Sequence, residues 1–278
     1  MPEYGCIYSE NFLEDVNGIA IITVGSDARR ENAGKTSPLE VALVAGSSDL
    51  LETIETTRGR LKQIPDIFPI IEVKYLDLDF YKYQNGISQE DGRYKNDNYP
   101  SRVIDAEFIS GDYTIFRLMK SKFDTFLRER GRDARPLIRK ERYRVKYFKT
   151  KLDEALEDRD YFAFDYRDTA IPEYREDISI RIKMTTLRLM QAYVTTSLMQ
   201  LIREGVVDTL EIPHQTDKRF AYLLAKGKIS SMKDSEELRD LYKYFLKKHI
   251  QGKRSRFFDP GREPDFRKNL ERLQLLFG

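Results

Sequence analysis

The dipeptide Gly25-Ser26 directly follows an apolar, β-branched run at 18–24, and its residue types are suited to holding anionic oxygens. A strand that ends in a tight Gly-Ser turn before a charged, helix-compatible segment presents backbone N–H groups that can bind phosphate. Arg29 and Arg30 follow within about one helical turn and can add charge-assisted contacts to the same ligand. The alternative is a strand-ending turn in which Ser26 only caps a helix.

Carboxylates accompany two further predicted strands, one at 40–44 and one in the run 70–80. Glu40 opens the first of them. Asp77 and Asp79 stand two residues apart in the second, a spacing that puts both on one side of a regular strand. Such oxygens are the ligands that Mg2+ takes in phosphoryl-transfer sites, so these three residues are the predicted metal ligands and catalytic residues. The alternative for the two aspartates is a solvated strand end.

Three segments, taken in order, resemble the nucleotidyltransferase superfamily, and within it the bacterial uridylyltransferases that modify the nitrogen-signalling PII protein. The segments are Gly25-Ser26 with Ser37-x-x-Glu40, then Ile104–Asp112, then Lys183-Met-Thr-Thr-Leu-Arg188. The resemblance implies that Gly25 and Ser26 hold a nucleoside triphosphate and that Lys183 and Arg188 approach it from a helical region. It also implies Mg2+ as the cofactor and a protein or small molecule as the acceptor.

The sequence departs from the superfamily pattern at the metal motif, which is Asp-x-Asp in that family. Here Pro38 stands at the first position and Glu40 at the second, and proline has no side-chain oxygen to bind a metal. Glu107 replaces an expected arginine, and Thr185 and Thr186 replace small glycines. Two functions therefore stay open. The chain is either a transferase that moves a nucleoside monophosphate onto a hydroxyl, or a catalytically degenerate regulatory or partner-binding module.

Lys183 and Arg188 lie on the most apolar predicted helix, which runs from about 177 to 204. On a regular α-helix, residues five positions apart point about 140° away from each other, so the two cations would not share a face. The alternative to a nucleotide contact is that both side chains reach along the helix to its solvated edge.

Composition narrows the class of protein. The 278 residues are 40% apolar and 34% charged, with a mean hydropathy of −0.59 and a formal net charge of +2. So small a net charge does not by itself indicate a nucleic-acid partner. One cysteine, Cys6, rules out an internal disulfide and, with two histidines, argues against zinc. No stretch approaches about 18 apolar residues, and no signal-like start is present, so we predict a cytoplasmic protein without a membrane partner.

A basic run at 128–151 interleaves cations with Tyr143, Tyr147 and Phe148. Basic charge combined with stacking rings can bind single-stranded nucleic acid. The same pattern is typical of the solvated face of a long helix, or of a docking face for an acidic protein partner. From the sequence alone we favour these last two interpretations, and nucleic acid is not an expected partner.

The predicted fold class is α+β, with a small mixed-sheet nucleotidyltransferase-like domain at 1–110 followed by an all-helical bundle at 111–278. A helix between the second and third strands is predicted to begin at Asp49, with Glu52 completing a capping box, and to stop at Pro65. The polar stretch 85–100 is predicted to be a loop. Asp112 is predicted to cap the next helix. Further helices are predicted at about 136–158, 177–204, 217–225, 234–249 and 264–277.

Overall fold

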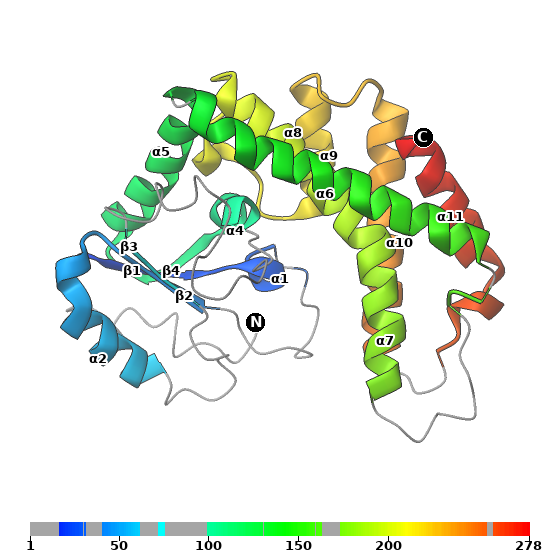
Figure 1. Cartoon of the computed structure of the whole chain (residues 1–278), viewed down its shortest axis with the longest axis horizontal. Coiled ribbons are helices and arrows are strands. Elements are labelled where there is room, and N and C mark those ends of the chain that lie inside the picture. Colours follow the sequence, from blue (N-terminus) through cyan, green and yellow to red (C-terminus); the bar gives the residue numbers. More distant parts are fainter. Residues whose placement is uncertain are drawn as a thin grey trace. The chain divides into compact units, whose positions relative to one another are not determined.

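The computed structural model describes residues 17–29, 31, 41–61, 72–75, 99–129, 131–158, 160–162, 173–254 and 258–278 (Figure 1). The chain forms two compact units. Unit 1 consists of Met1–Ile138 together with Met199–Gln215, and unit 2 consists of Arg139–Leu198 together with Thr216–Gly278.

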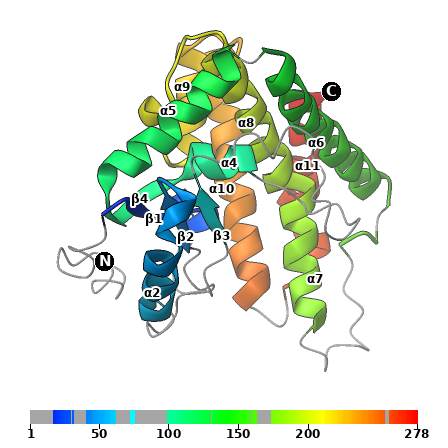
Figure 2. The ribbon, with the colours of Figure 1, turned by 60° about the vertical axis from the view of Figure 1, so that its left-hand side comes forward.

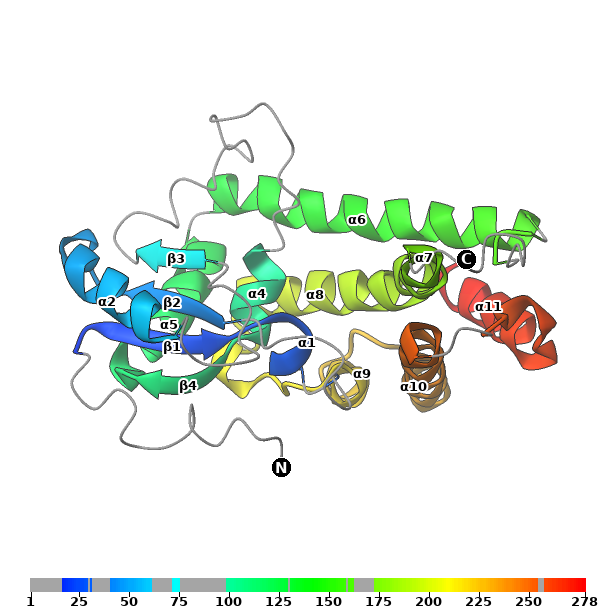
Figure 3. The same cartoon turned by 90° about the horizontal axis from the view of Figure 1, so that it is seen from below.

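The described part of unit 1 is built around a four-stranded mixed sheet. Its strands are β1 (Ile19–Thr23), β2 (Val41–Ala45), β3 (Glu72–Tyr75) and β4 (Glu107–Gly111), which lie side by side in the order β3-β2-β1-β4 (Figure 3). The central strand β1 is antiparallel to both β2 and β4, whereas β2 and β3 are parallel. Every residue of β1 and β2 is buried, so both faces of these strands are covered, which explains their unbroken apolar sequences.

Helices complete unit 1. They are α1 (Gly25–Ala28), α2 (Leu51–Leu61) after the 3-10 turn η2 (Ser48–Leu50), α4 (Tyr99–Asp105) and α5 (Tyr113–Glu129). Helix α5 packs across β1, β2 and β4. Asp112 caps it, since its Oδ1 accepts a hydrogen bond from the Thr114 N–H at 2.8 Å and its Oδ2 accepts one from the Gly18 N–H at 3.2 Å. Burial acts to raise the pKa of Asp112, but these backbone donors outweigh it, so the pKa lies below its usual value.

Gly111 is the last residue of β4 and pairs with Ala20, near the start of β1. Its φ of 88° lies in the left-handed region, and a Cβ added there would stand 2.4 Å from the carbonyl oxygen of Ile19. The register between β1 and β4 also shifts between Ile21 and Ile22. Only glycine fits this close approach of two backbones, so Gly111 fixes the path from β4 into α5.

The segment 199–215 belongs to unit 1 because two residues of α5 hold it. Arg128 donates from Nε to the carbonyl oxygen of Ile202 at 3.0 Å and from Nη2 to that of Val207 at 2.9 Å. Asp124 accepts hydrogen bonds from both the N–H and the hydroxyl of Thr209, each at 3.1 Å to Oδ2. Thr209 opens a short 3-10 turn, η6 (Thr209–Glu211).

The described residues of unit 2 form helices and turns, without a strand. The unit contains α6 (Gly131–Glu157, from Arg139 onward), α7 (Glu173–Ile182), the π-helical segment η5 (Lys183–Leu187), α8 (Arg188–Arg203, up to Leu198), α9 (Thr216–Ala225), α10 (Met232–Arg254), η7 (Pro260–Arg262) and α11 (Pro264–Phe277). Helix α10 is central, because α7, α9 and α11 all pack against it; Figure 2 shows α7 and α10 side by side. Phe266 of α11 meets Phe162 and Phe245 edge to face at 5.0 and 5.8 Å between ring centroids.

The α+β class expected from the sequence is confirmed, and the predicted strands at 18–24 and 40–44 correspond to β1 and β2. Of the predicted loop 85–100, Tyr99 and Pro100 belong to α4, and the rest lies outside the described residues. The division of the chain differs from the boundary expected near residue 110, because α5 packs on the sheet and therefore stays with unit 1. Among the described residues, no helix combines the length and apolar character needed to cross a membrane.

Candidate functional site

The Gly25 turn lies at one end of the sheet, beside the starts of two neighbouring strands. Thr23, the last residue of β1, pairs with Val41 on one side and with Glu107 on the other. The chain therefore leaves β1 toward Gly25 at the end of the sheet where β2 begins after Glu40 and where β4 begins with Glu107. Gly25 has a φ of 72°, a conformation that glycine adopts without steric cost.

The residues around this turn are described to different extents. The backbone of Ser26 belongs to α1, but its side chain, and the whole of Arg30 and Glu40, lie outside the described residues. Glu107 also lies at this end of the sheet. The sequence alone marked it only as a glutamate in place of an expected arginine, and not as a residue of the site. Strand pairing, and not any local signal, places it beside the end of β1.

The register gives no support for bringing Asp77 and Asp79 to the same place. Strand β3 runs parallel to β2 and ends at Tyr75, which pairs with Ala45. Ala45 in turn pairs with Ile19, at the end of the sheet opposite Gly25. Asp77 and Asp79 themselves lie outside the described residues, so their predicted metal-binding role stays a prediction.

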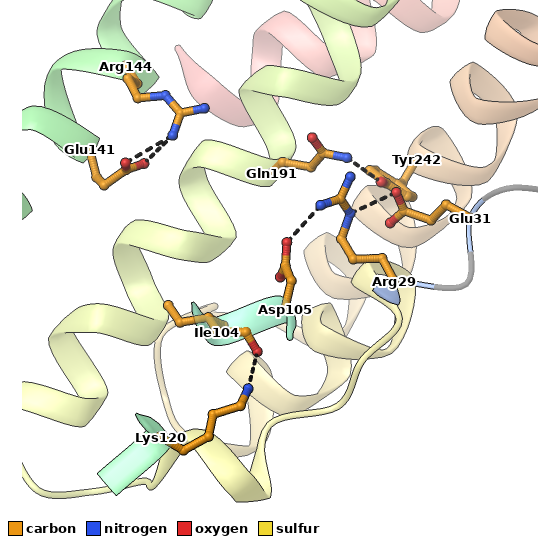
Figure 4. Close-up of polar contacts among 9 residues, drawn as sticks. All are labelled: Arg29, Glu31, Ile104, Asp105, Lys120, Glu141, Arg144, Gln191 and Tyr242. Carbon is orange, nitrogen blue, oxygen red and sulfur yellow. Dashed lines mark hydrogen bonds and ion pairs between the residues drawn. The ribbon is translucent and has the colours of Figure 1, made fainter. Parts of the chain in front are cut away.

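Arg29 stands at the centre of a buried ion network in unit 1 (Figure 4). Its Nε donates to Glu31 at 2.9 Å and its Nη1 donates to Asp105 at 2.7 Å. All three residues are buried, and Asp105 comes from the end of α4, 76 positions along the chain. The network ties the segment that follows β1 to α4, so in this structure Arg29 holds the turn in place.

The predicted contact of Arg29 with phosphate remains a prediction, and the structure shows what it would compete with. Two carboxylates already accept hydrogen bonds from the guanidinium. Sequence reasoning missed this arrangement because nothing local links Arg29 to Asp105. A buried arginine with two carboxylates is stable only while all partners are present, since removal of one leaves an uncompensated charge.

Lys120 of α5 is a second buried cation in unit 1 (Figure 4). Its Nζ donates to the carbonyl oxygen of Ile104 at 3.0 Å and stands 5.5 Å from the centroid of the Phe116 ring. Ile104 and Asp105 are neighbours at the end of α4. Arg29, which precedes α4 in the chain, binds Asp105, and Lys120, which follows α4, binds Ile104.

In unit 2, the predicted cationic pair flanks an irregular turn. The helix expected at about 177–204 is interrupted by η5, in which the N–H of Arg188 bonds to the carbonyl oxygen of Lys183. A bond between residues five apart closes one wide turn, so Arg188 lies one turn beyond Lys183 along the helix. The separation of about 140° expected for a regular helix does not hold here. π-turns of this kind occur often at functional sites.

Two threonines of the wide turn bond back to carbonyl oxygens of the preceding turn. The hydroxyl of Thr185 donates to the carbonyl oxygen of Arg181 at 2.8 Å, and that of Thr186 donates to the carbonyl oxygen of Ile182 at 2.6 Å. In a regular α-helix each of these carbonyls accepts from the backbone N–H four residues on, so the hydroxyls compete with the α-helical bonds.

His249 of α10 lies close to this turn and is held by Ser179 of α7. Its Nδ1 lies 2.7 Å from the Ser179 hydroxyl and 2.9 Å from the Ser179 carbonyl oxygen. Burial lowers the pKa of His249 to about 4, and the positive charges of Lys183, Lys253 and Arg188 lower it further, while the bond to Ser179 opposes them. The imidazole is therefore neutral near pH 7.

Glu141 of α6 contributes a buried carboxylate to unit 2. Both of its oxygens accept hydrogen bonds from Nη1 of Arg144, at 2.9 and 2.8 Å (Figure 4). Burial raises the pKa of Glu141, and the charge and hydrogen bonds of Arg144 oppose that rise. Among the described residues, no group of three or more histidines, cysteines or acidic residues is arranged to hold a metal ion.

No protein-family model matches this chain, no curated protein matches it, and no solved structure matches it. The assignment of a function therefore rests on the residues and geometry given above.

Proposed function

We propose that this chain binds a nucleoside triphosphate at the end of the sheet marked by Gly25, as a protein of the nucleotidyltransferase type. The observation that carries the proposal is the register that pairs Thr23 with both Val41 and Glu107. It brings the Gly25 turn next to the start of β2, where the sequence supplies Glu40. A turn rich in backbone donors beside a carboxylate-bearing strand suits a phosphate chain with its Mg2+.

In the active form of this proposal, the transferred group is a nucleoside monophosphate. The hydroxyl oxygen of a protein or small-molecule acceptor attacks the α-phosphorus, the bond to the β-phosphate oxygen breaks, pyrophosphate leaves and the hydroxyl proton is lost. Glu40 is proposed to hold Mg2+, which would stabilise the charge on the leaving group. Ser26 is proposed to position the nucleotide, and the nucleotide contact that the resemblance implies for Lys183 and Arg188 stays a prediction.

The second candidate is a binding module without transfer, and Pro38 favours it. A metal site that lacks the first carboxylate of an Asp-x-Asp pair loses an anionic oxygen ligand at the reacting phosphate. Both candidates share the bound triphosphate and differ only in turnover, so binding is tested first and transfer second.

Binding is tested by thermal denaturation with ATP, GTP, CTP and UTP, each with Mg2+, with Mn2+ and without metal. A ligand present at about 100 times its Kd stabilises the folded state by about 2.7 kcal/mol, so at least one triphosphate is expected to raise Tm. Ser26→Ala should reduce the shift, whereas Ser121→Ala, on the exposed surface of α5, should leave it unchanged. Absence of a shift with every triphosphate at millimolar concentration contradicts the proposal.

The contribution of the cationic pair is tested by the same assay. Lys183→Ala and Arg188→Ala should each weaken triphosphate binding, and Lys247→Ala, which removes an exposed cation from α10, is the matched control. Equal binding by all three variants would contradict the nucleotide contact predicted for Lys183 and Arg188.

Transfer is tested with α-³²P-labelled triphosphates, Mn2+ and a lysate as the source of acceptors. In a transferase, label appears on an acceptor, and Glu40→Gln abolishes it. In the degenerate module, the triphosphate raises Tm and no acceptor becomes labelled.

A further inference from the structure

One face of α6 carries cations and tyrosine rings that the rest of the described chain leaves uncovered. The helix buries a stripe that includes Ile138, Glu141, Phe148, Leu152 and Ala155. The opposite face exposes Arg139, Arg142, Tyr143, Lys146 and Tyr147, which recur at three- and four-residue intervals and so form one line along the helix. We call these five residues the α6 basic face.

The charges of this face are not neutralised within the described part of the chain. From Arg139 to Lys151 the sequence holds seven cations and one acidic residue, Glu141, which is buried and paired with Arg144. Lys151 pairs with Glu154. The other five cations have no ion pair among the described residues; they are Arg139, Lys140, Arg142, Lys146 and Lys149. Like charges at these spacings destabilise a helix unless a partner of opposite charge is bound.

The tyrosines of the face are available for stacking. Tyr143 is 67% exposed, and no ring or cation contact involves it among the described residues. Tyr147 is 43% exposed; its ring meets Phe148 edge to face at 5.3 Å, and Lys151 Nζ lies 5.9 Å from its centroid. The two residues are one turn apart on the same side of the helix, at a separation of about 6 Å along the axis.

We infer that the α6 basic face binds single-stranded nucleic acid. Protein interfaces are enriched in aromatic residues and arginine but depleted in lysine, and they have an apolar core. The line from Arg139 to Tyr147 contains no aliphatic side chain and includes lysine. Unpaired cations for phosphates alternating with open rings for bases are the features that single strands require. The inference is independent of the proposed triphosphate site.

Binding is measured by fluorescence anisotropy of fluorescein-labelled U20 and dT20 on the full chain, from 50 to 300 mM salt. If each of the five cations without an ion pair contacts one phosphate of the single strand, log K should fall against log salt with a slope of about −3.5. Tyr143→Ala and Tyr147→Ala should each raise Kd about tenfold, because a stacked base is lost. Tyr143→Phe and Tyr147→Phe keep the rings and should bind like the wild type.

The charge contribution has a matched control. Arg139→Ala/Arg142→Ala/Lys146→Ala should abolish binding at 150 mM salt. Lys233→Ala/Lys247→Ala/Lys268→Ala removes the same charge from other exposed positions of unit 2 and should change Kd less than threefold. All these positions are on the surface, and circular dichroism verifies that each variant is folded. Ultraviolet crosslinking of wild-type complexes should map to the peptide that contains Tyr143.

Several results would overturn the inference. Failure of both U20 and dT20 to bind at 50 mM salt would refute it. If Tyr143→Ala and Tyr147→Ala both leave the affinity unchanged, the bases do not stack on these rings and the binding is only a non-specific attraction between charges. Equal or tighter binding of poly-L-glutamate, with the same loss in the triple variant, would identify the face as a docking site for an acidic protein segment instead.

Discussion

In unit 1, the buried guanidinium of Arg29 is matched inside the fold by Glu31 and Asp105, and the buried Lys120 by a backbone carbonyl. In unit 2, by contrast, Lys183, Arg188 and Lys253 act together on His249, and the α6 basic face has no ion pairs among the described residues. Charge in unit 1 therefore joins its own elements, whereas in unit 2 the three cations of the α6 basic face form no ion pair among the described residues. The predictions below test this difference.

The largest effect is expected from Asp105→Asn. This change leaves Glu31 as the one carboxylate paired with the buried Arg29 among the described residues, and breaking a buried ion pair costs about 3–5 kcal/mol. Urea denaturation measures the loss of unfolding free energy. Glu55→Gln removes an exposed partner of Arg58 and should cost less than about 1 kcal/mol. Similar losses in the two variants would show that the Arg29 network does not hold unit 1 together.

The pH dependence of unit 2 should follow His249. Its pKa is about 4 in the folded chain against an ordinary value of 6.5, so between these limits the unfolded state binds the extra proton. Stability is then complete above about pH 6.5 and falls by on the order of 3 kcal/mol as the pH drops to 4. Urea denaturation across this range should show the fall, and His249→Gln should flatten it.

Asp124 should give unit 1 the opposite pH dependence. Burial raises its pKa to about 6 from an ordinary 3.8, against the hydrogen bonds from Thr209, so the folded state holds the proton more tightly. This contribution to stability is complete below pH 3.8 and is lost as the pH rises through 6, by about 3 kcal/mol. Asp124→Asn removes the dependence. A probe in each unit, read separately, should report slopes of opposite sign.

Gly111→Ala should cost at least about 2 kcal/mol, because the left-handed conformation penalises any Cβ and the Ile19 carbonyl leaves no space for it. Gly205→Ala is the matched control, since Gly205 also has a positive φ, 72°, but nothing lies within 4 Å of its added Cβ. It should cost about 1–2 kcal/mol. Thermal denaturation of both variants measures the two costs. The loss in Gly205→Ala reports the backbone conformation alone, and the additional loss in Gly111→Ala reports the steric contact with Ile19.

The smallest effect is expected from Thr186→Val, which removes the hydroxyl that occupies the Ile182 carbonyl. The loss of one hydrogen bond is worth about 1 kcal/mol, and the turn should shift toward a regular helix. Triphosphate affinity should fall severalfold, since Arg188 changes its direction relative to Lys183. Thr196→Val removes a similar bond to Ala192 from regular helix and should leave the affinity unchanged.

The local sequence predicted strands and helices well where one or both faces of the strand or helix are apolar. The β-branched run before Gly25 predicted β1, and Asp112 followed by apolar residues at helical spacing predicted α5 with its cap. The sequence also singled out Lys183 and Arg188, but it assumed a regular helix between them. The π-turn η5 changed that geometry, and hydropathy patterns do not report it.

The amino-acid sequence by itself determined which segments form strands and helices, since periodicity and capping are local properties. Only the tertiary structure decided that Glu107 stands beside the end of β1, that Asp105 pairs with Arg29, and that β3 ends away from Gly25. These pairings join residues far apart in the chain, and they depend on strand order and register. Packing of whole elements selects that order, and no short segment encodes it.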